Sequence, residues 1–87
     1  MRHLSDYSDE ELEEFRRVND YREIRRLPDG SIAILQDLLF TRAILLGSDT
    51  LIAFERRYCF ENRAWASREF ALLESKNDEP EGYTATR

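Results

Sequence analysis

The chain has 87 residues, of which 41% are apolar and 36% are charged, and its net charge is −5 at pH 7. Such a length suits one small domain with a single core. The composition is too apolar for a disordered chain and too charged for a membrane protein. Its acidic balance argues against a simple basic-patch nucleic-acid-binding protein. One His and one Cys exclude an internal disulfide and most metal sites.

The negative charge is concentrated at one end of the chain. Residues 1–14 hold six acids and one base, whereas residues 15–75 hold ten Arg against nine acids. Among the 13 bases, only Lys76 is Lys. Arg pairs bidentately with carboxylates and phosphates and is enriched at interfaces, although a GC-rich genome would give the same bias. An acidic segment is therefore joined to a near-neutral, Arg-dominated body.

The first segment predicts a helix over 9–18. Ser8 and Glu11 have the spacing of a capping box, and Tyr7 and Leu12 occupy the positions of a hydrophobic staple. Acids crowd the first turn and bases the last turn, which suits the helix dipole. The helix carries a narrow apolar stripe of Leu12, Phe15 and Val18.

The next segment predicts a β-hairpin. A strand is expected over 22–27, and Pro28-Asp29-Gly30 supplies a turn, because Pro presets φ and Gly accepts a positive φ. Residues 31–46 allow two interpretations: one apolar helix, or two short strands over 31–36 and 40–46. The Leu and Ala content favours the helix, whereas the preceding turn favours the strands. We favour the strands.

The second half of the chain predicts a strand over 51–60 and a helix over 63–75. Alternating aromatic residues are typical of a strand. One face of this strand should hold Ile52, Phe54, Tyr58 and Phe60 with Arg56, and the other Glu55, Arg57, Cys59 and Glu61. Asn62 is a suitable N-cap for the helix. Its apolar stripe consists of Ala66, Phe70 and Leu73, with Trp65 and Leu72 on one shoulder.

These elements predict an α+β fold, with a small antiparallel β-sheet of three to four strands flanked by an N-terminal and a C-terminal helix. Residues 1–75 would form the single domain, and residues 76–87 a polar flexible tail. The most apolar stretch, 32–46, is too short and too charged to span a bilayer. The single Cys fits a reducing compartment, so we expect a cytoplasmic protein with no membrane partner.

No residue pattern points to catalysis. His3 is the single imidazole and lies at a terminus, while Cys59 has no His nearby in the sequence and is explained as a small buried apolar residue. Glycine-rich phosphate loops, nucleophile motifs, zinc spacings and calcium loops do not occur. We therefore expect no enzymatic activity, no cofactor and no metal site.

Two motifs stand out: Leu-Pro-Asp-Gly-Ser-Ile at 27–32 and Arg-Tyr-Cys-Phe-Glu at 57–61. With these motifs the chain resembles a group of small uncharacterised phage and prophage proteins. The resemblance covers about residues 24–83. The chain departs from the pattern because its middle segment lacks glycines and its tail lacks a Pro-Gly-Trp ending. The resemblance implies a viral setting and a host-cell cytoplasm, and it assigns no activity to any residue.

The first functional hypothesis is a phage-encoded interaction protein that binds and inhibits or modulates a host protein, in the manner of an anti-CRISPR protein. Carboxylates spaced along a helix can occupy Arg and Lys sites that otherwise hold phosphate. The predicted contacts with a basic partner surface are Asp9, Glu10, Glu13 and Glu14. For each single residue, a solvated helix face is the simpler explanation.

Two other hypotheses stay open. A nucleic-acid-binding accessory module would use an Arg-rich sheet, although the near-neutral body supports it poorly. Its contacts would be Arg25, Arg26, Arg56 and Arg57. A homodimeric structural protein would complete its burial by pairing, with Tyr58 and Trp65 as interface anchors.

Overall fold

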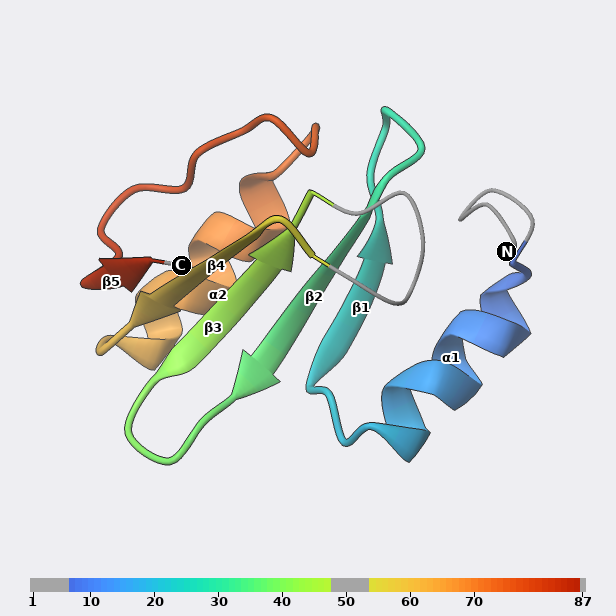
Figure 1. The fold of residues 1–87 in the computed structure, drawn as a ribbon, viewed down its shortest axis with the longest axis horizontal. Coiled ribbons are helices and arrows are strands. Elements are labelled where there is room, and N and C mark those ends of the chain that lie inside the picture. The colour runs from blue at the N-terminus through green and yellow to red at the C-terminus, as the bar shows by residue number, and fades with distance from the viewer. Residues whose placement is uncertain (1–6, 48–53, 87) are drawn as a thin grey trace.

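The computed structural model describes residues 7–47 and 54–86. Two helices and one five-stranded antiparallel sheet, in the order β1-β2-β3-β4-β5, make up the fold (Figure 1). The elements are α1 (Asp9–Val18), β1 (Glu23–Arg26), β2 (Ile32–Asp37), β3 (Arg42–Leu46), β4 (Arg56–Phe60), α2 (Arg63–Leu72) and β5 (Ala85–Thr86). The predicted α+β class is confirmed, with one strand more than the three to four expected. The segment 31–46 forms two strands and no helix.

Helix α1 begins where the capping box predicts. The Ser8 hydroxyl accepts a hydrogen bond from the amide of Glu11 at 3.1 Å, and the Glu11 carboxylate accepts one from the amide of Ser8 at 3.0 Å. These two bonds satisfy amides that the first helical turn would otherwise leave unpaired. At the other end Asn19 bonds back to the carbonyl of Phe15, and Asp20 adopts a left-handed φ of 54°. Local sequence thus sets both ends of α1.

The turn between β1 and β2 is held by Asp29. Its carboxylate accepts hydrogen bonds from the amide of Ser31 at 3.0 Å and from the Ser31 hydroxyl at 2.5 Å. Gly30 follows with a φ of +88°, which a residue with a Cβ rarely adopts. The second carboxylate oxygen accepts the amide of Lys76 at 2.9 Å. Asp29 therefore joins the hairpin to the segment after α2.

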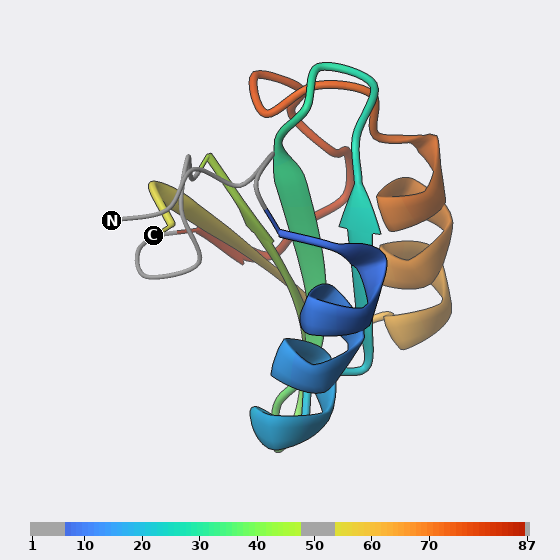
Figure 2. The ribbon, with the colours of Figure 1, turned by 90° about the vertical axis from the view of Figure 1, so that its right-hand side faces the viewer.

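Both faces of the sheet are covered at its centre. The pair Leu35 and Ile44 points towards α2, whereas the neighbouring pair Ile34 and Leu45 points to the opposite side. The α2-side cluster contains Leu27, Ala33, Leu35, Ile44, Leu46, Tyr58, Phe60, Ala66, Phe70 and Leu73. The opposite cluster contains Leu12, Ile32, Ile34 and Leu45. Helix α1 thus lies beside β1, on the side of the sheet away from α2 (Figure 2).

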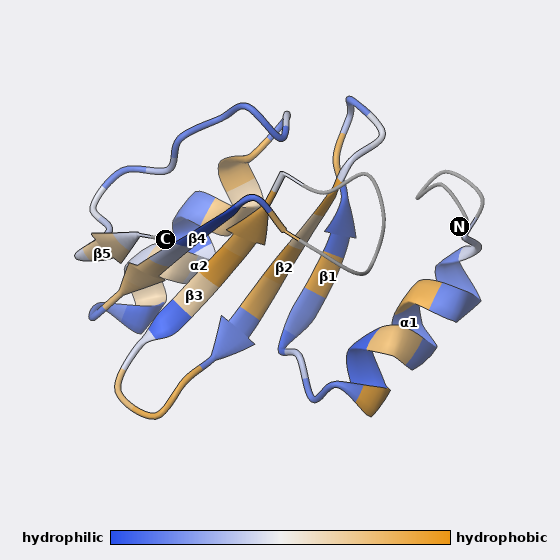
Figure 3. Ribbon diagram, viewed as in Figure 1, coloured by the Kyte–Doolittle hydropathy of each residue, from blue (hydrophilic) through white to orange (hydrophobic). Residues whose placement is uncertain are grey.

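Hydropathy follows this arrangement. Apolar residues concentrate on β2 and β3, whereas α1 is mostly hydrophilic with separate apolar patches (Figure 3). All five residues of β3 are buried, as are the first four of β2. Within the described residues, no helix is long and apolar enough to cross a membrane.

Two details of the predicted second half are corrected. Strand β4 begins at Arg56, so Phe54 precedes the ladder and packs against the α1-side cluster, opposite to Tyr58 and Phe60. The other predicted members of that strand, 51–53, lie outside the described residues. Helix α2 ends at Leu72 because Leu73 turns to extended backbone and buries its side chain, and Leu72 is left 63% exposed.

The segment 76–86, expected to be a flexible tail, returns along the sheet. Its strand β5 pairs with β4, which gives the fifth strand. The indole nitrogen of Trp65 donates to the carbonyl of Glu81 at 2.7 Å, and the backbone of Gly82 lies so close to the indole that a Cβ there would approach Nε1 to 2.5 Å. The ring of Tyr83 lies 4.9 Å from that of Tyr58. These contacts form only when the chain folds. The polar composition of the segment, taken alone, therefore predicted a flexible tail.

Arg42 connects three parts of the fold. This residue is only 9% exposed, and its Nε donates to the Asp37 carboxylate at 2.6 Å, across the β2–β3 hairpin. Its Nη1 donates to the Ser67 hydroxyl at 2.6 Å and to the Arg63 carbonyl at 3.2 Å, both on α2. The hydrogen bond from Arg42 is the main reason that the pKa of Asp37 is lowered from its ordinary value. A buried guanidinium that bonds to Asp37 on one side and to α2 on the other fixes α2 against the hairpin.

Replacing Arg42 tests this connection. Arg42→Ala removes the charged hydrogen bonds to Asp37 and Ser67, and we expect it to lower the free energy of unfolding by about 2–3 kcal/mol. Urea denaturation of the pure protein measures the change. Arg17→Ala is the matched control, because Arg17 pairs with Glu14 while both side chains are 67% exposed. The control should lower the free energy of unfolding by less than about 0.5 kcal/mol. Equal losses of stability in the two variants would contradict the role of Arg42.

Asp29 predicts a pH-dependent contribution to stability. Burial raises its pKa, but hydrogen bonds from Ser31 and the amide of Lys76 outweigh burial and lower the pKa from 3.8 to about 2. A carboxyl group whose folded pKa is depressed stabilises the protein above its unfolded pKa and loses this effect as the pH falls. Since Asp29 is exposed, we expect Asp29→Asn to cost about 1 kcal/mol at pH 6. Urea midpoints should show the difference from wild type shrinking between pH 4 and pH 2, whereas a constant difference would contradict this account.

Candidate functional site

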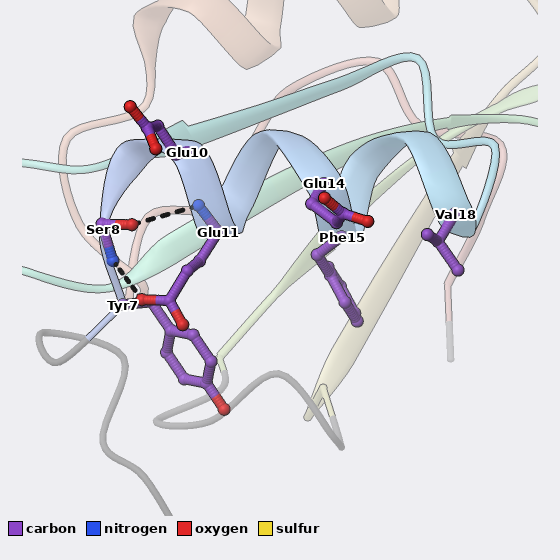
Figure 4. A pocket seen from close by; sticks show the side chains of 7 residues that line it. All are labelled: Tyr7, Ser8, Glu10, Glu11, Glu14, Phe15 and Val18. Atoms are coloured by element: carbon purple, nitrogen blue, oxygen red, sulfur yellow. Dashed lines mark hydrogen bonds between the residues drawn. The ribbon is translucent and has the colours of Figure 1, made fainter.

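One flank of α1 is hollowed. A depression of about 680 Å³ is lined by Tyr7, Ser8, Glu10, Glu11, Glu14, Phe15 and Val18. Tyr7, Glu11, Phe15 and Val18 recur every three to four residues, so they form a row along the helix. Figure 4 shows this row on one side of α1, with Glu10 projecting from the other edge.

The apolar part of this depression comes from the predicted stripe. Leu12 is 4% exposed and belongs to the core, whereas Phe15 is half-buried and Val18 is 70% exposed. Tyr7, which precedes the N-cap, is half-buried against the same cluster as Phe15. The predicted stripe is therefore divided between the core and an open surface.

The four predicted acidic contacts are exposed but do not act as one group. Glu10 and Glu14 line the depression, one helical turn apart, whereas Asp9 and Glu13 do not. Glu13 accepts hydrogen bonds from Nε and Nη2 of Arg16, which lower the pKa of its carboxyl group. Asp9 lies 4.0 Å from the Arg26 guanidinium.

The remaining two carboxylates of the set, Glu10 and Glu14, are the ones that lie at the depression. Glu14 pairs with Arg17 at 3.2 Å, where both side chains are 67% exposed and solvent screens the pair. Across the described ranges 7–47 and 54–86, Glu10 makes no ion pair or side-chain hydrogen bond. The depression therefore combines an apolar row with two carboxylates that can meet cations.

Sequence reasoning named Glu10 and Glu14 but not the apolar lining beside them. It assigned Tyr7 to a staple, Glu11 to a cap, and Phe15 and Val18 to an apolar stripe of the helix. The spacing 11, 15 and 18 is compatible with one helix flank. Which part of that flank the sheet covers depends on the docking of α1, so only the structure separates Leu12 from Val18.

The four Arg of the alternative hypothesis are distributed over both faces. Arg25 donates to the carbonyl of Phe70 at 2.7 Å, and Arg56 donates to that of Lys76. Arg26 donates to the carbonyl of Tyr7 at 2.7 Å, on the α1 side. Strands β1 and β4, which carry these residues and Arg57, are three strand spacings apart, or about 14 Å. The geometry brings together no basic patch from these four residues.

The two suggested dimer anchors are engaged within the chain. Tyr58 is 4% exposed and packs in the core, so it offers no surface to a partner. Trp65 is half-buried, bonded to Glu81 and covered by the guanidinium of Arg68 at 4.6 Å from the ring centroid. Among the residues that the structure describes, the exposed large apolar side chains lie elsewhere, at Val18, Leu39, Phe40 and Leu72.

Comparisons with known proteins identify no relative. No protein-family model matches the chain, and neither a curated protein nor a solved structure matches it. In the part of the chain that the structure describes, no group of three His, Cys, Asp or Glu side chains is arranged to hold a metal ion.

The contrast between Leu12 and Val18 is testable by substitution. We expect Leu12→Ala to lower the free energy of unfolding by about 2–4 kcal/mol, because it leaves a cavity in the core. Val18→Ala should change it by less than about 0.5 kcal/mol, because Val18 faces solvent. Urea denaturation measures both. A large loss with Val18→Ala would show that this end of α1 is covered and that the depression is closed.

Proposed function

We propose that this protein is a small interaction protein that binds a basic surface of another protein through the acidic flank of α1. The observation that carries the proposal is the placement of two exposed carboxylates, one turn apart, on the lining of an apolar depression, with Glu14 near Phe15 and Val18 and Glu10 projecting from the other edge. Clusters of one charge speed the encounter with a partner of opposite charge and select against others.

The wider setting is also proposed. The phage-like motifs at 27–32 and 57–61 favour a host protein as the partner, with inhibition or modulation as the consequence. A host immunity protein that binds nucleic acid would present the Arg and Lys surface that such carboxylates fit. An anti-CRISPR-like role is one form of this proposal.

The nucleic-acid hypothesis draws less support from the geometry. Arg25, Arg26 and Arg56 each donate to a backbone carbonyl of their own chain. A guanidinium held in this way has fewer donors left for a phosphate. The homodimer hypothesis loses Tyr58 as an anchor, because this side chain is buried.

Charge reversal on α1 tests the proposal. Tagged wild-type protein and the double variant Glu10→Lys/Glu14→Lys would be used for affinity capture from a bacterial lysate, followed by titration of the captured protein. We expect the double variant to weaken binding at least tenfold, because two attractions become repulsions. Raising the salt concentration should weaken wild-type binding more than that of the variant.

A charge-matched control separates the site from general electrostatics. Glu61→Lys/Glu74→Lys makes the same change of net charge at two exposed side chains outside α1. This control should retain wild-type affinity. Equal weakening in both double variants, or none in either, would contradict α1 as the binding surface.

A further inference from the structure

We infer that the depression on α1 receives an amphipathic basic helix of the partner, with its apolar row against Tyr7, Phe15 and Val18 and its cations at Glu10 and Glu14. This inference rests on the proposed function and specifies the partner's chemistry.

The shape of the site indicates an elongated occupant. The lining residues run from Tyr7 to Val18, which at about 1.5 Å per residue corresponds to about 16 Å, or three helical turns. A single inserted side chain would leave most of this length uncovered. The backbone of α1 is bonded within the helix, so a partner strand would find no free amides or carbonyls along it. A partner helix lying along α1 would cover this length and would need no free backbone groups from α1.

The apolar row requires apolar contacts from the partner. Val18 is 70% exposed, and Tyr7 and Phe15 are each half-buried. A purely charged partner would leave this surface in water, whereas Leu or Ile at helical spacing would cover it. Helix-in-groove recognition uses such anchors at intervals of three and four residues.

The carboxylates set the charge and spacing of the partner. Glu10 and Glu14 are separated by four residues, so their Cβ atoms lie about 6 Å apart. Lys or Arg residues one turn apart on a facing helix match this spacing. Glu14 can exchange its exposed pairing with Arg17 for a partner cation at little cost. Residues 7–18 carry five acids and two Arg, and this negative charge disfavours the binding of acidic peptides or nucleic acid at the depression.

Two synthetic 18-residue peptides of identical Leu and Lys composition test the inference. In one, Leu recurs at helical spacing with Lys on the flanks, and in the other the same residues are scrambled so that no apolar face forms. Fluorescence anisotropy would measure binding to the full chain, and circular dichroism would report whether the peptide becomes helical. We expect the amphipathic peptide to bind at least tenfold more tightly and to gain helicity on binding.

Variants locate the contact. Val18→Ser should weaken binding of the amphipathic peptide at least threefold and leave binding of the scrambled peptide unchanged, because only the amphipathic peptide contacts the apolar row. Glu10→Gln/Glu14→Gln should weaken both peptides. Leu72→Ser, which removes another exposed apolar side chain, is the matched control and should change neither.

The outcomes separate this inference from the proposed function. Equal binding of the two peptides, lost in Glu10→Gln/Glu14→Gln, would overturn the amphipathic occupant and leave the basic partner in place. Binding of both peptides that no α1 variant weakens would overturn the inference and the proposed function together. Binding of neither peptide, with self-association in light scattering that Val18→Ser abolishes, would overturn the inference in favour of a second copy of the chain.

Discussion

The placement of α2 depends on one buried guanidinium group, which adds directional hydrogen bonds to the apolar packing between α2 and the sheet. Arg42 is buried between the β2–β3 hairpin and α2, and its donors are shared among Asp37, Ser67 and the carbonyl of Arg63. A buried charge is tolerated only when its hydrogen bonds are satisfied. The position of α2 relative to the sheet is therefore restricted to an arrangement that satisfies Arg42.

The same use of Arg recurs across the molecule. In residues 7–47 and 54–86, six Arg side chains donate to backbone carbonyls, and most of these bonds join separate segments: Arg16, Arg25, Arg26, Arg42, Arg56 and Arg63. A planar fork with several donors can satisfy loop carbonyls that no helix or sheet pairs. The strong preference for Arg over Lys thus has a structural use within the chain, which reduces what it implies about nucleic acid.

Because many Arg bond within the chain, the surface has two kinds of region. On the sheet and α2, charged side chains are largely engaged with the chain itself. On the outer flank of α1, carboxylates and apolar side chains remain accessible together, because the helix buries only the narrow side that carries Leu12. A second accessible apolar feature is the β2–β3 turn, where Leu39 and Phe40 are each 81% exposed while Arg63 holds the turn's carbonyls. At both places, exposed apolar side chains project from a backbone that is held by hydrogen bonds. Such a surface is more typical of partner binding than of a surface that only keeps a protein in solution.

The sequence by itself determined the elements whose signals are local. The capping box gave α1 its start, Pro28-Asp29-Gly30 gave the hairpin its turn, and alternating Tyr58 and Phe60 gave β4 its inward face. Residues 31–46 stayed ambiguous between helix and strands because β2 and β3 are buried on both faces at the centre of the sheet, which removes the alternation that marks a strand. The sequence also did not predict that segment 76–86 packs against the sheet, because its polar residues acquire partners such as Trp65 only after folding. Tertiary structure alone decided which part of the α1 stripe is buried and which Arg of the sheet are engaged, since both depend on contacts between segments far apart in the chain.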